Sequence, residues 1–515
     1  MSKTLKIRQK TESYVSTTNA CKLCKPLGAC LAFRGIEGCV PYLHGSQGCA
    51  TYMRRYIISH FREPIDIASS SLSEKHAVYG GGPNLMKGIL NIMDKYGAKI
   101  IGVATTCLTE TIGDDVSRLL KEFEAEFGDR ELPTLVNVST PSYSGTHMEG
   151  FHATVREVID QLATGDGETQ RYGNSKIRNI PNFQSKICGT QSPHAAGIDE
   201  VQAGSAVSRR STLHFQHNGD RNPKSKILNL LPGLCSPADI RYLKEILGDF
   251  GISGIILPDI SETLDAPAQL DYEKIPEGGT PLAAIQGMGS SQATIEFGQV
   301  LSRSHSTGGQ LLQERFHVPL YSIGMPIGLR ECDRFFDILE EVSGCLTPRK
   351  HELERGRLVD AYVDGHKYVF GKRAVVYGEE DLVVGLTAFL AEIGLKPVLC
   401  ASGGNSGHFQ DAIAAVTSDI LTEPPIVKEG FDFYEITKEI ESLEADILIG
   451  TSKGYPIARK HNIPLIRAGF PIHDRFGSQR ILHLGYRGTQ TLLDSIINAF
   501  IDKKQADSPV GYGYL

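Results

Sequence analysis

The cysteine at position 49 lies in a short polar stretch, HGSQGCATY at residues 44–52. Buried structural thiols usually lie among apolar residues, whereas Cys49 follows glycine, serine and glutamine. Cys24, Cys107 and Ser142 are three further sulfur or hydroxyl donors, each beside a short apolar run. Thiolates that converge on one site bind iron-sulfur clusters or zinc. These residue types therefore indicate a metal site in the first third of the chain.

Spacing alone leaves three interpretations of these thiols open. Structural zinc sites usually combine two close ligand pairs, but here Cys21 and Cys24 form a C-x-x-C that no second pair follows. An iron-sulfur cluster needs only that separate thiolates converge. Inert buried thiols are the third interpretation. We expect it to hold for the other cysteines, which are Cys30, Cys39, Cys188, Cys235, Cys332, Cys345 and Cys400.

The elements around these residues alternate between strand and helix patterns. An apolar run at 100–105 predicts a buried strand ending just before Cys107, and apolar residues at helical spacing predict a helix over 116–127. A second strand, 134–138, ends shortly before Ser142, and the run CVPYLH precedes Cys49. Ligands gather at the carboxyl ends of parallel strands, so these donors are expected at one edge of a sheet.

The same alternation continues along the chain and predicts the α/β class, with three doubly wound, Rossmann-like domains and mostly parallel sheets. The first domain spans 1–163, and a polar insertion or linker rich in Gly, Ser and Asn follows at 164–224. The second and third domains span 225–345 and 346–515. We expect His194, His214 and His217, in the insertion, to be surface histidines.

Composition excludes several classes of protein. The chain has 515 residues, 41% hydrophobic, with a net charge of -7, so it lacks the basic field that nucleic-acid binders need. No apolar stretch approaches the roughly 18 to 20 residues of a membrane span, and the N-terminus lacks the apolar core of an export signal. We therefore expect a cytoplasmic protein whose 11 cysteines are not a disulfide framework.

Six motifs follow one another in the first part of the chain: NACKLCKPLGA, PYLHGSQGCATYMRRY, SHFREP, SSSLSEKHAVYGGG, TTCLTETIGDD and TPSYSGTHMEGF. In this order and at these spacings they resemble the β-type subunit family of nitrogenase component 1, the molybdenum-iron protein. The resemblance continues through ERGRLVDAYVDGHKYVFGKR, DILIGTSKGYPIARKHNIPLIRAGFPIHDR and LGYRGTQTLLDSIINAFID. It covers nearly the whole chain except residues 164–224. The family's component 1 fold agrees with the three expected α/β domains.

The resemblance implies ligands for a cluster shared with another chain. Cys24, Cys49 and Cys107 match the three β-side ligands of the [8Fe-7S] P-cluster, and Ser142 matches the serine that binds its oxidised form. The partner is a homologous α-type subunit in an α2β2 heterotetramer, reduced by an ATP-dependent iron protein. The molybdenum-iron cofactor belongs to the α-type subunit, so no catalytic residue or cofactor ligand for it is assigned here.

Several neighbouring residues acquire expectations from the same comparison. Glycines 45 and 48 are expected to let backbone approach the cluster closely. Tyr52 corresponds to a position beside the cluster. Glu63 corresponds to a residue of an intersubunit cation site, and the alternative is that it forms an ordinary salt bridge. Cys21 is the ligand instead of Cys24 if the register differs.

Three functions share this scaffold. One is the β subunit of nitrogenase, which passes electrons for nitrogen fixation; the second is the β-type half of the FeMo-cofactor assembly scaffold, with a simpler [4Fe-4S] cluster. The third is a nitrogenase-like oxidoreductase such as methylthio-alkane reductase. The complete ligand set favours a P-cluster, but the sequences NACKLCKPLGACLAFRGIEG and LNLLPGLCSPADIRYLKEILGDFG favour the assembly scaffold. We therefore expect the scaffold role in FeMo-cofactor biosynthesis, with the catalytic or reductase role as the alternative. A different class of function is a purely structural partner whose cysteines hold no cluster.

Overall fold

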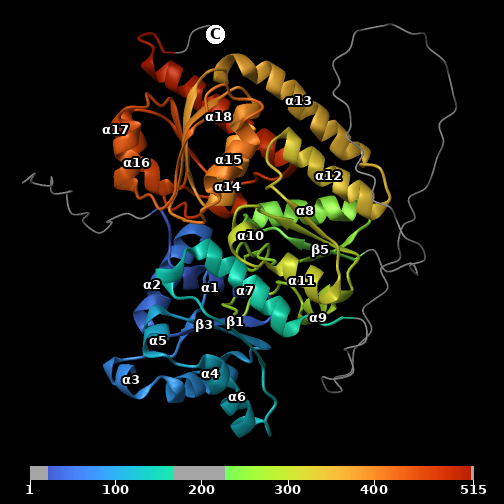
Figure 1. Ribbon diagram of the computed structural model, residues 1–515, viewed down its shortest axis with the longest axis vertical. Helices are drawn as coiled ribbons and strands as arrows, with labels where there is room; N and C mark the ends of the chain where they lie inside the picture. The colour runs from blue at the N-terminus through green and yellow to red at the C-terminus, as the bar shows by residue number, and fades with distance from the viewer. Residues whose placement is uncertain (1–20, 166–226, 269, 512–515) are drawn as a thin grey trace, which may run out of the picture.

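The computed structural model describes residues 21–165, 227–268 and 270–511. It contains three sheets, and every strand pairing within them is parallel. One sheet lies in each of the three predicted domains, which confirms the α/β class with parallel sheets. Figure 1 shows the first part in blue to cyan at the bottom, the second in green to yellow, and the third in orange to red at the top. The predicted insertion, with Cys188 and its three histidines, lies almost wholly outside the described residues.

The first sheet has four strands in the order β2-β1-β3-β4. Its strands are β1 (Cys39–His44), β2 (Ala68–Ser69), β3 (Ile100–Thr105) and β4 (Thr134–Val138). Its helices are α1 (Lys25–Arg34), α2 (Gln47–Phe61), α3 (Glu74–Tyr79), α4 (Gly82–Tyr96), α5 (Cys107–Ile112), α6 (Val116–Phe127), η1 (Ser142–Ser144) and α7 (His147–Leu162). The strand order changes direction between β1 and β3, so their carboxyl ends border the crevice in which doubly wound folds bind ligands.

The second sheet repeats this order as β6-β5-β7-β8. Its strands are β5 (Ile227–Leu231), β6 (Ser253–Ile256), β7 (Ala293–Phe297) and β8 (Leu320–Ile323). The helices around it are α8 (Pro237–Asp249), α9 (Leu282–Gln286), η2 (Gly287–Ser290), α10 (Leu301–Ser304), α11 (Gly308–Phe316), α12 (Leu329–Ser343) and α13 (Arg349–Val369). The long helix α13 packs on the last helix of the chain and so connects the second part to the third.

The third sheet has five strands in the order β11-β10-β9-β12-β13, the usual doubly wound arrangement. Its strands are β9 (Arg373–Gly378), β10 (Lys396–Ser402), β11 (Ile426–Lys428), β12 (Ile447–Gly450) and β13 (Leu465–Arg467). Its helices are α14 (Glu380–Glu392), α15 (Phe409–Thr417), α16 (Phe433–Ile440), η3 (Ser452–Gly454), α17 (Tyr455–His461), η4 (Ser478–Arg480) and α18 (Gly485–Asp507).

The predicted strands at 100–105 and 134–138 and the helix at 116–127 are confirmed at the same residues. They are short apolar runs or strongly amphipathic stretches, for which local pattern is sufficient. The two-residue strand β2 was not predicted, because it exists only through its pairing with β1. The exact domain boundaries remain a prediction, since one apolar core cluster contains residues from all three parts.

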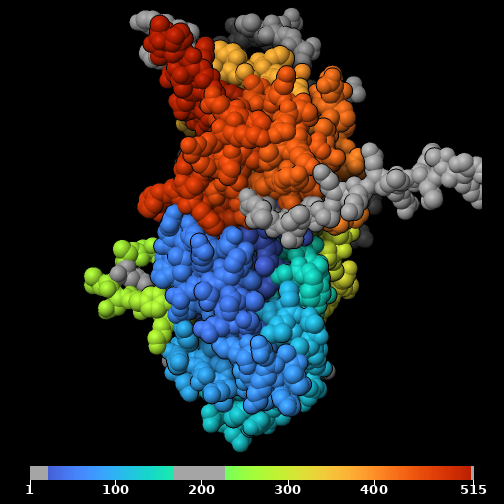
Figure 2. Space-filling view, turned by 90° about the vertical axis from the view of Figure 1, so that its left-hand side faces the viewer, coloured from blue at the N-terminus to red at the C-terminus, as the bar shows by residue number. Residues whose placement is uncertain are grey.

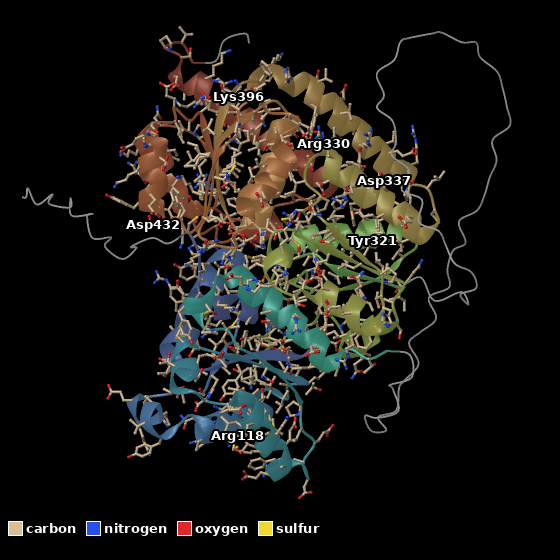
Figure 3. The ribbon with its side chains drawn as sticks, viewed as in Figure 1. Arg118, Tyr321, Arg330, Asp337, Lys396 and Asp432 are labelled. Carbon is tan, nitrogen blue, oxygen red and sulfur yellow. The ribbon has the colours of Figure 1, made fainter. Side chains whose placement is uncertain are left out.

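The three parts pack against one another, and one apolar core cluster of the described residues extends through all of them. In Figure 2 the blue first part and the orange-red third part share a long boundary. Charged side chains such as Arg118 of α6 and Lys396 at the start of β10 lie at the outer surface, near opposite ends of the molecule (Figure 3). Within the described residues, no helix is long and apolar enough to cross a membrane.

Candidate metal centre

Cys49 lies in the first turn of α2, directly after β1 ends at His44. Ser46 caps this helix, and its side chain accepts a hydrogen bond from the Gly48 N–H at 3.3 Å. The cap explains the polar composition of the stretch that contains Cys49. The cysteine is only partly buried, so its sulfur is available to a ligand at the surface of the first part.

Cys107 is the first residue of α5 and follows the neighbouring strand β3. The two strand ends approach each other closely: a Cβ at Gly45 would lie 2.0 Å from the Thr106 hydroxyl. An added Cβ at Gly45 would thus collide with Thr106, and the close approach of its backbone to a cluster stays a prediction. A Cβ at Gly48 would meet only the Ser46 hydroxyl, at 3.6 Å. The space into which a side chain at position 48 would project is therefore largely open.

Ser142 begins the 3-10 turn η1, which follows β4. Its backbone N–H donates a hydrogen bond to the Cys107 sulfur, with a distance of 3.2 Å between nitrogen and sulfur. Thr140 holds this segment against β3, since its N–H donates to the Thr105 hydroxyl at 2.8 Å and its own hydroxyl donates to the Thr105 carbonyl at 2.7 Å. The structure therefore brings Ser142 to Cys107 across 35 residues of sequence.

Cys24 is the N-cap residue of α1, which packs on α7. Two glycines make this contact possible: a Cβ at Gly28 would lie 1.7 Å from the His147 carbonyl, and one at Gly150 would lie 1.9 Å from the Lys25 carbonyl. The Lys25 ammonium also donates to the Ser144 hydroxyl at 3.2 Å. These contacts place the start of α1 beside the turn that carries Ser142.

Cys49 is close enough to the other two thiols for them to influence its ionisation. Burial raises the pKa of Cys49, and the neighbouring Cys24 and Cys107 raise it further. Without a cation nearby, Cys49 therefore keeps its proton more readily than an isolated thiol would.

The donor set fits an iron-sulfur cluster better than a single metal ion. No group of three or more His, Cys, Asp or Glu side chains within the described residues is placed to hold one ion. In a multi-iron cluster different thiolates bind different iron atoms, so the ligands need not meet at one point. Cys24, Cys49 and Cys107 would hold such a group, and the Ser142 N–H, already bonded to a ligand sulfur, would tune it.

Sequence reasoning missed the buried residues that fix this edge of the sheet. His44 is fully buried, and its ring nitrogens lie 3.0 Å from the Ser70 hydroxyl and 3.1 Å from the Asp114 carboxylate. Burial lowers the pKa of His44, and Asp114 partly offsets this. The Ser70 hydroxyl also accepts from the Gly45 N–H at 2.9 Å. No sequence signal joins these residues, because Asp114 lies 70 positions from His44.

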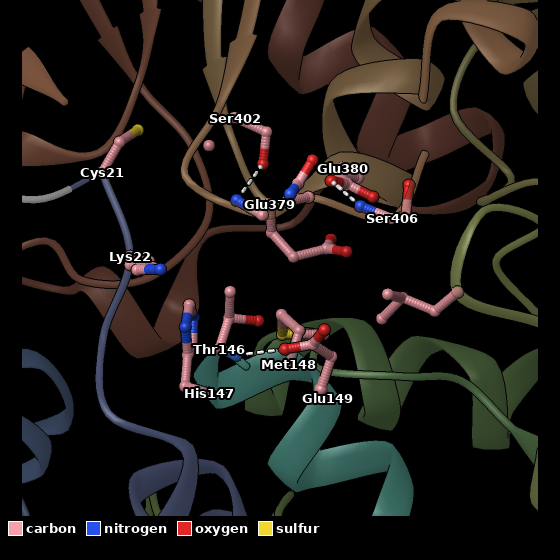
Figure 4. A pocket seen from close by; sticks show the side chains of 14 residues that line it. Cys21, Lys22, Thr146, His147, Met148, Glu149, Glu379, Glu380, Ser402 and Ser406 are labelled. Atoms are coloured by element: carbon pink, nitrogen blue, oxygen red, sulfur yellow. Dashed lines mark hydrogen bonds between the residues drawn. The ribbon is translucent and has the colours of Figure 1, made fainter. Parts of the chain in front are cut away.

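Cys21 belongs to a different environment from Cys24. It lines a small cavity between the first and third parts, together with His147, Glu379 and Glu380 (Figure 4). The approach to the third part is close, since a Cβ at Gly403 would lie 2.5 Å from the Cys21 backbone. Burial raises the pKa of Cys21 to about 12, partly offset by Lys453. This placement supports Cys24 rather than Cys21 as the ligand.

The burial of most of the remaining described cysteines agrees with the packing roles expected for them. Cys30 and Cys39 are buried in the first part, and burial raises the pKa of Cys39 to about 12. Buried thiols in the other parts are Cys235, Cys332 and Cys400, whereas Cys345 is only partly buried.

Tyr52 and Glu63 lie on and just after α2. Burial raises the pKa of Tyr52, with contributions from a hydrogen bond to Tyr56 and from Cys24, so this phenol lies near a candidate ligand. Burial also raises the pKa of Glu63, which accepts a hydrogen bond from the Ala266 backbone and has Asp265 nearby. The cation site at Glu63 stays a prediction.

Comparisons with known proteins agree with this geometry. Residues 24–501 match the family model described as nitrogenase component 1 type oxidoreductase. The nitrogenase molybdenum-iron protein beta chain of Clostridium pasteurianum is 32% identical over 485 residues, covering 94% of this chain and 93% of that one. The corresponding beta chain of Methanothermobacter thermautotrophicus is 32% identical over 506 residues, covering 96% of each.

A solved structure shows the same fold. A chain of nitrogenase Cp1 at pH 6.5 matches with a TM-score of 0.83 and 31% identity, covering 98% of both chains. A chain of Cp1 at pH 5 matches at 14% identity with a TM-score of 0.61, which concerns the fold alone. The chain therefore belongs to the nitrogenase component 1 type oxidoreductase family, and within it is similar to the beta chains of molybdenum-iron proteins.

Proposed function

We propose that the chain is the β-type subunit of a component 1 complex and holds half of an iron-sulfur cluster shared with a homologous α-type subunit. The observation that carries this proposal is the hydrogen bond from the Ser142 N–H to the Cys107 sulfur after β3, supported by the effect of Cys24 and Cys107 on the pKa of Cys49 after β1. The cluster would supply one-electron transfer, and an ATP-dependent iron protein would deliver the electrons. The expected assembly is an α2β2 heterotetramer.

The protein's own residues would set the properties of this cluster. Cys24 and Cys49 lie at the starts of α1 and α2, and the Ser142 N–H, which donates to the Cys107 sulfur, would tune a cluster bound there by hydrogen bonding. The resemblance to the family assigns the Ser142 hydroxyl as an oxygen ligand of the oxidised cluster, and the contact of its backbone with Cys107 supports this assignment. That role separates an [8Fe-7S] P-cluster from a simple [4Fe-4S] cluster.

Two roles of such a subunit remain as proposals. The sequence wording favours the FeMo-cofactor assembly scaffold, while the retained Ser142 beside Cys107 favours a P-cluster and thus electron transfer to a catalytic cofactor on the partner. The relatives named above are beta chains of molybdenum-iron proteins, so they do not favour the scaffold role over the catalytic role.

Iron and acid-labile sulfide per αβ unit, measured on anaerobically co-purified complex, test the proposal. About eight irons, with an oxidised-state EPR signal altered in Ser142→Ala, indicate a P-cluster, whereas about four irons and a simple reduced-state signal indicate the scaffold. Cys107→Ala should lose most of this iron, and Cys345→Ala, a partly buried thiol outside the first part, should keep it. A colourless, iron-free wild-type complex would leave only the structural-partner role.

A further inference from the structure

A second cavity lies where the three parts of the molecule meet. Its volume is about 50 Å³, and its walls come from α2, from the segment after β5, and from the segment before α18. The walls are mainly apolar, including Phe61, Leu234, Ile327 and Phe470. The cavity is separate from the thiol site, because none of the candidate cluster ligands lines it.

Most polar groups in these walls already have partners within the chain. Asp239 accepts hydrogen bonds from the His483 and Leu484 N–H groups at 2.8 and 3.0 Å. The Ser236 hydroxyl donates to the Ile481 carbonyl at 2.6 Å and accepts from the Asp239 N–H. The cavity therefore offers few free polar atoms to hold ordered water, which needs two to four partners.

The imidazole of His60 is also part of the lining. The His60 Nδ1 accepts a hydrogen bond from the Ile472 N–H at 2.9 Å, which places the ring proton on Nε2. The ring lies between the aromatic rings of Phe61 and Phe470, at centroid distances of 4.4 and 4.9 Å. His60 is 4% exposed, so its imidazole lies in buried, mainly apolar surroundings.

The volume limits the size of an occupant. A water molecule needs roughly 10 to 15 Å³ measured in this way, and an apolar cavity of roughly 150 Å³ accommodates benzene. A space of about 50 Å³ therefore fits a molecule larger than water and smaller than benzene. Cys235 also lines it, and burial raises the pKa of that thiol, so the lining carries no thiolate that would attract a cation.

We propose that this cavity is a binding site for a small, neutral, apolar molecule of gas size. The walls from all three parts would then close around the molecule, and binding would stabilise their arrangement. The proposal is independent of the cluster.

The site can be tested with crystals of the complete protein, purified together with its partner. The crystals are pressurised with xenon, and the anomalous signal of the gas locates the bound atoms. Xenon should occupy the cavity beside Leu234 and Phe470. It should leave empty the larger space of about 190 Å³ lined by Arg373, Lys396 and Glu423, because charged walls favour water. Xenon in neither place, or ordered water that xenon does not displace from the first, would overturn the proposal.

Variants that fill the cavity provide the matched test. Leu234 is only partly buried and lies in a loop, so Leu234→Phe should fill the space and abolish the xenon peak while the fold is kept. Ile481→Phe should fill the same cavity from the segment before α18, and it replaces the first variant if that variant does not fold. Leu421→Phe, at the charged space, should leave the xenon peak unchanged. A peak that persists in both filling variants would contradict the assigned position.

Discussion

At the scale of single residues, the most unusual groups are the buried carboxyls beside Cys21. Burial raises the pKa of Glu380 to about 7, and one of its carboxyl oxygens has no hydrogen-bond partner, while the other accepts from the Ser406 N–H at 3.3 Å. Glu379 and Glu296 show the same effect, with pKa values raised to about 8 and about 7 by burial. These carboxyls are therefore neutral over part of the physiological pH range.

The raised pKa of Glu380 predicts how stability depends on pH. Between its ordinary value of 4.5 and about 7 the folded chain holds a proton that the unfolded chain has released, so this group makes stability fall as pH rises through that window. Glu380→Gln, which resembles the neutral acid, should reduce the fall between pH 5 and 7.5 by roughly 1 to 3 kcal/mol. Urea unfolding at several pH values measures this, and parallel curves for both proteins would contradict it.

At the scale of elements, the metal site depends on two strand ends that touch. Gly45 at the end of β1 contacts Thr106 at the end of β3, and this contact sets the separation of the turns that carry Cys49 and Cys107. Close packing of this kind tolerates no added methyl group without displacement of a neighbour. We therefore expect the absence of a side chain at position 45 to help position the two ligands.

Gly45→Ala should destabilise the protein by about 1 to 3 kcal/mol and lower its iron content, because the new methyl group must separate the two turns. Gly48→Ala is the matched control, three residues along, where the nearest neighbour is 3.6 Å away; its unfolding free energy should change by less than about 0.5 kcal/mol. Urea unfolding of both variants checks this comparison. Equal midpoints for the two would show that the Gly45 contact is not rigid.

At the scale of the whole molecule, buried carboxylates join the second and third parts. Asp381 of α14 accepts hydrogen bonds from the backbone N–H groups of Gln299, Val300 and Leu301 at 2.6, 2.8 and 3.4 Å. Asp239 of α8 makes the reciprocal contact with the start of α18. Each part thus satisfies backbone donors of the other, which favours one cooperative unit over independent domains.

Asp381→Ala should leave those three N–H groups without partners and lower the free energy of unfolding by roughly 2 to 4 kcal/mol. The control is Asp419→Ala, which removes a surface ion pair with Arg330 whose side chains are 57% and 54% exposed; it should cost less than about 1 kcal/mol. Arg330 is labelled in Figure 3. Chemical unfolding, followed by circular dichroism, measures the free energy of unfolding of both variants. Similar decreases in the two would refute the interdomain role of Asp381.

The sequence by itself determined the α/β class and several elements at their observed bounds. It also identified the family, which the comparisons confirm, and from the family it predicted Cys24, Cys49, Cys107 and Ser142 as ligands. These predictions were possible because periodicity, caps and ordered motifs are local properties of the chain. The ligand assignments themselves stay predictions until iron is measured.

Only the tertiary structure decided which neighbours these residues have. It placed Cys21 in the boundary with the third part, filled the space beside Gly45 with Thr106, and joined His44 to Asp114. Such contacts link positions tens to hundreds of residues apart, so no local pattern encodes them. The free energy that selects them comes from burial and from the need to satisfy buried polar groups, which only the packed chain defines.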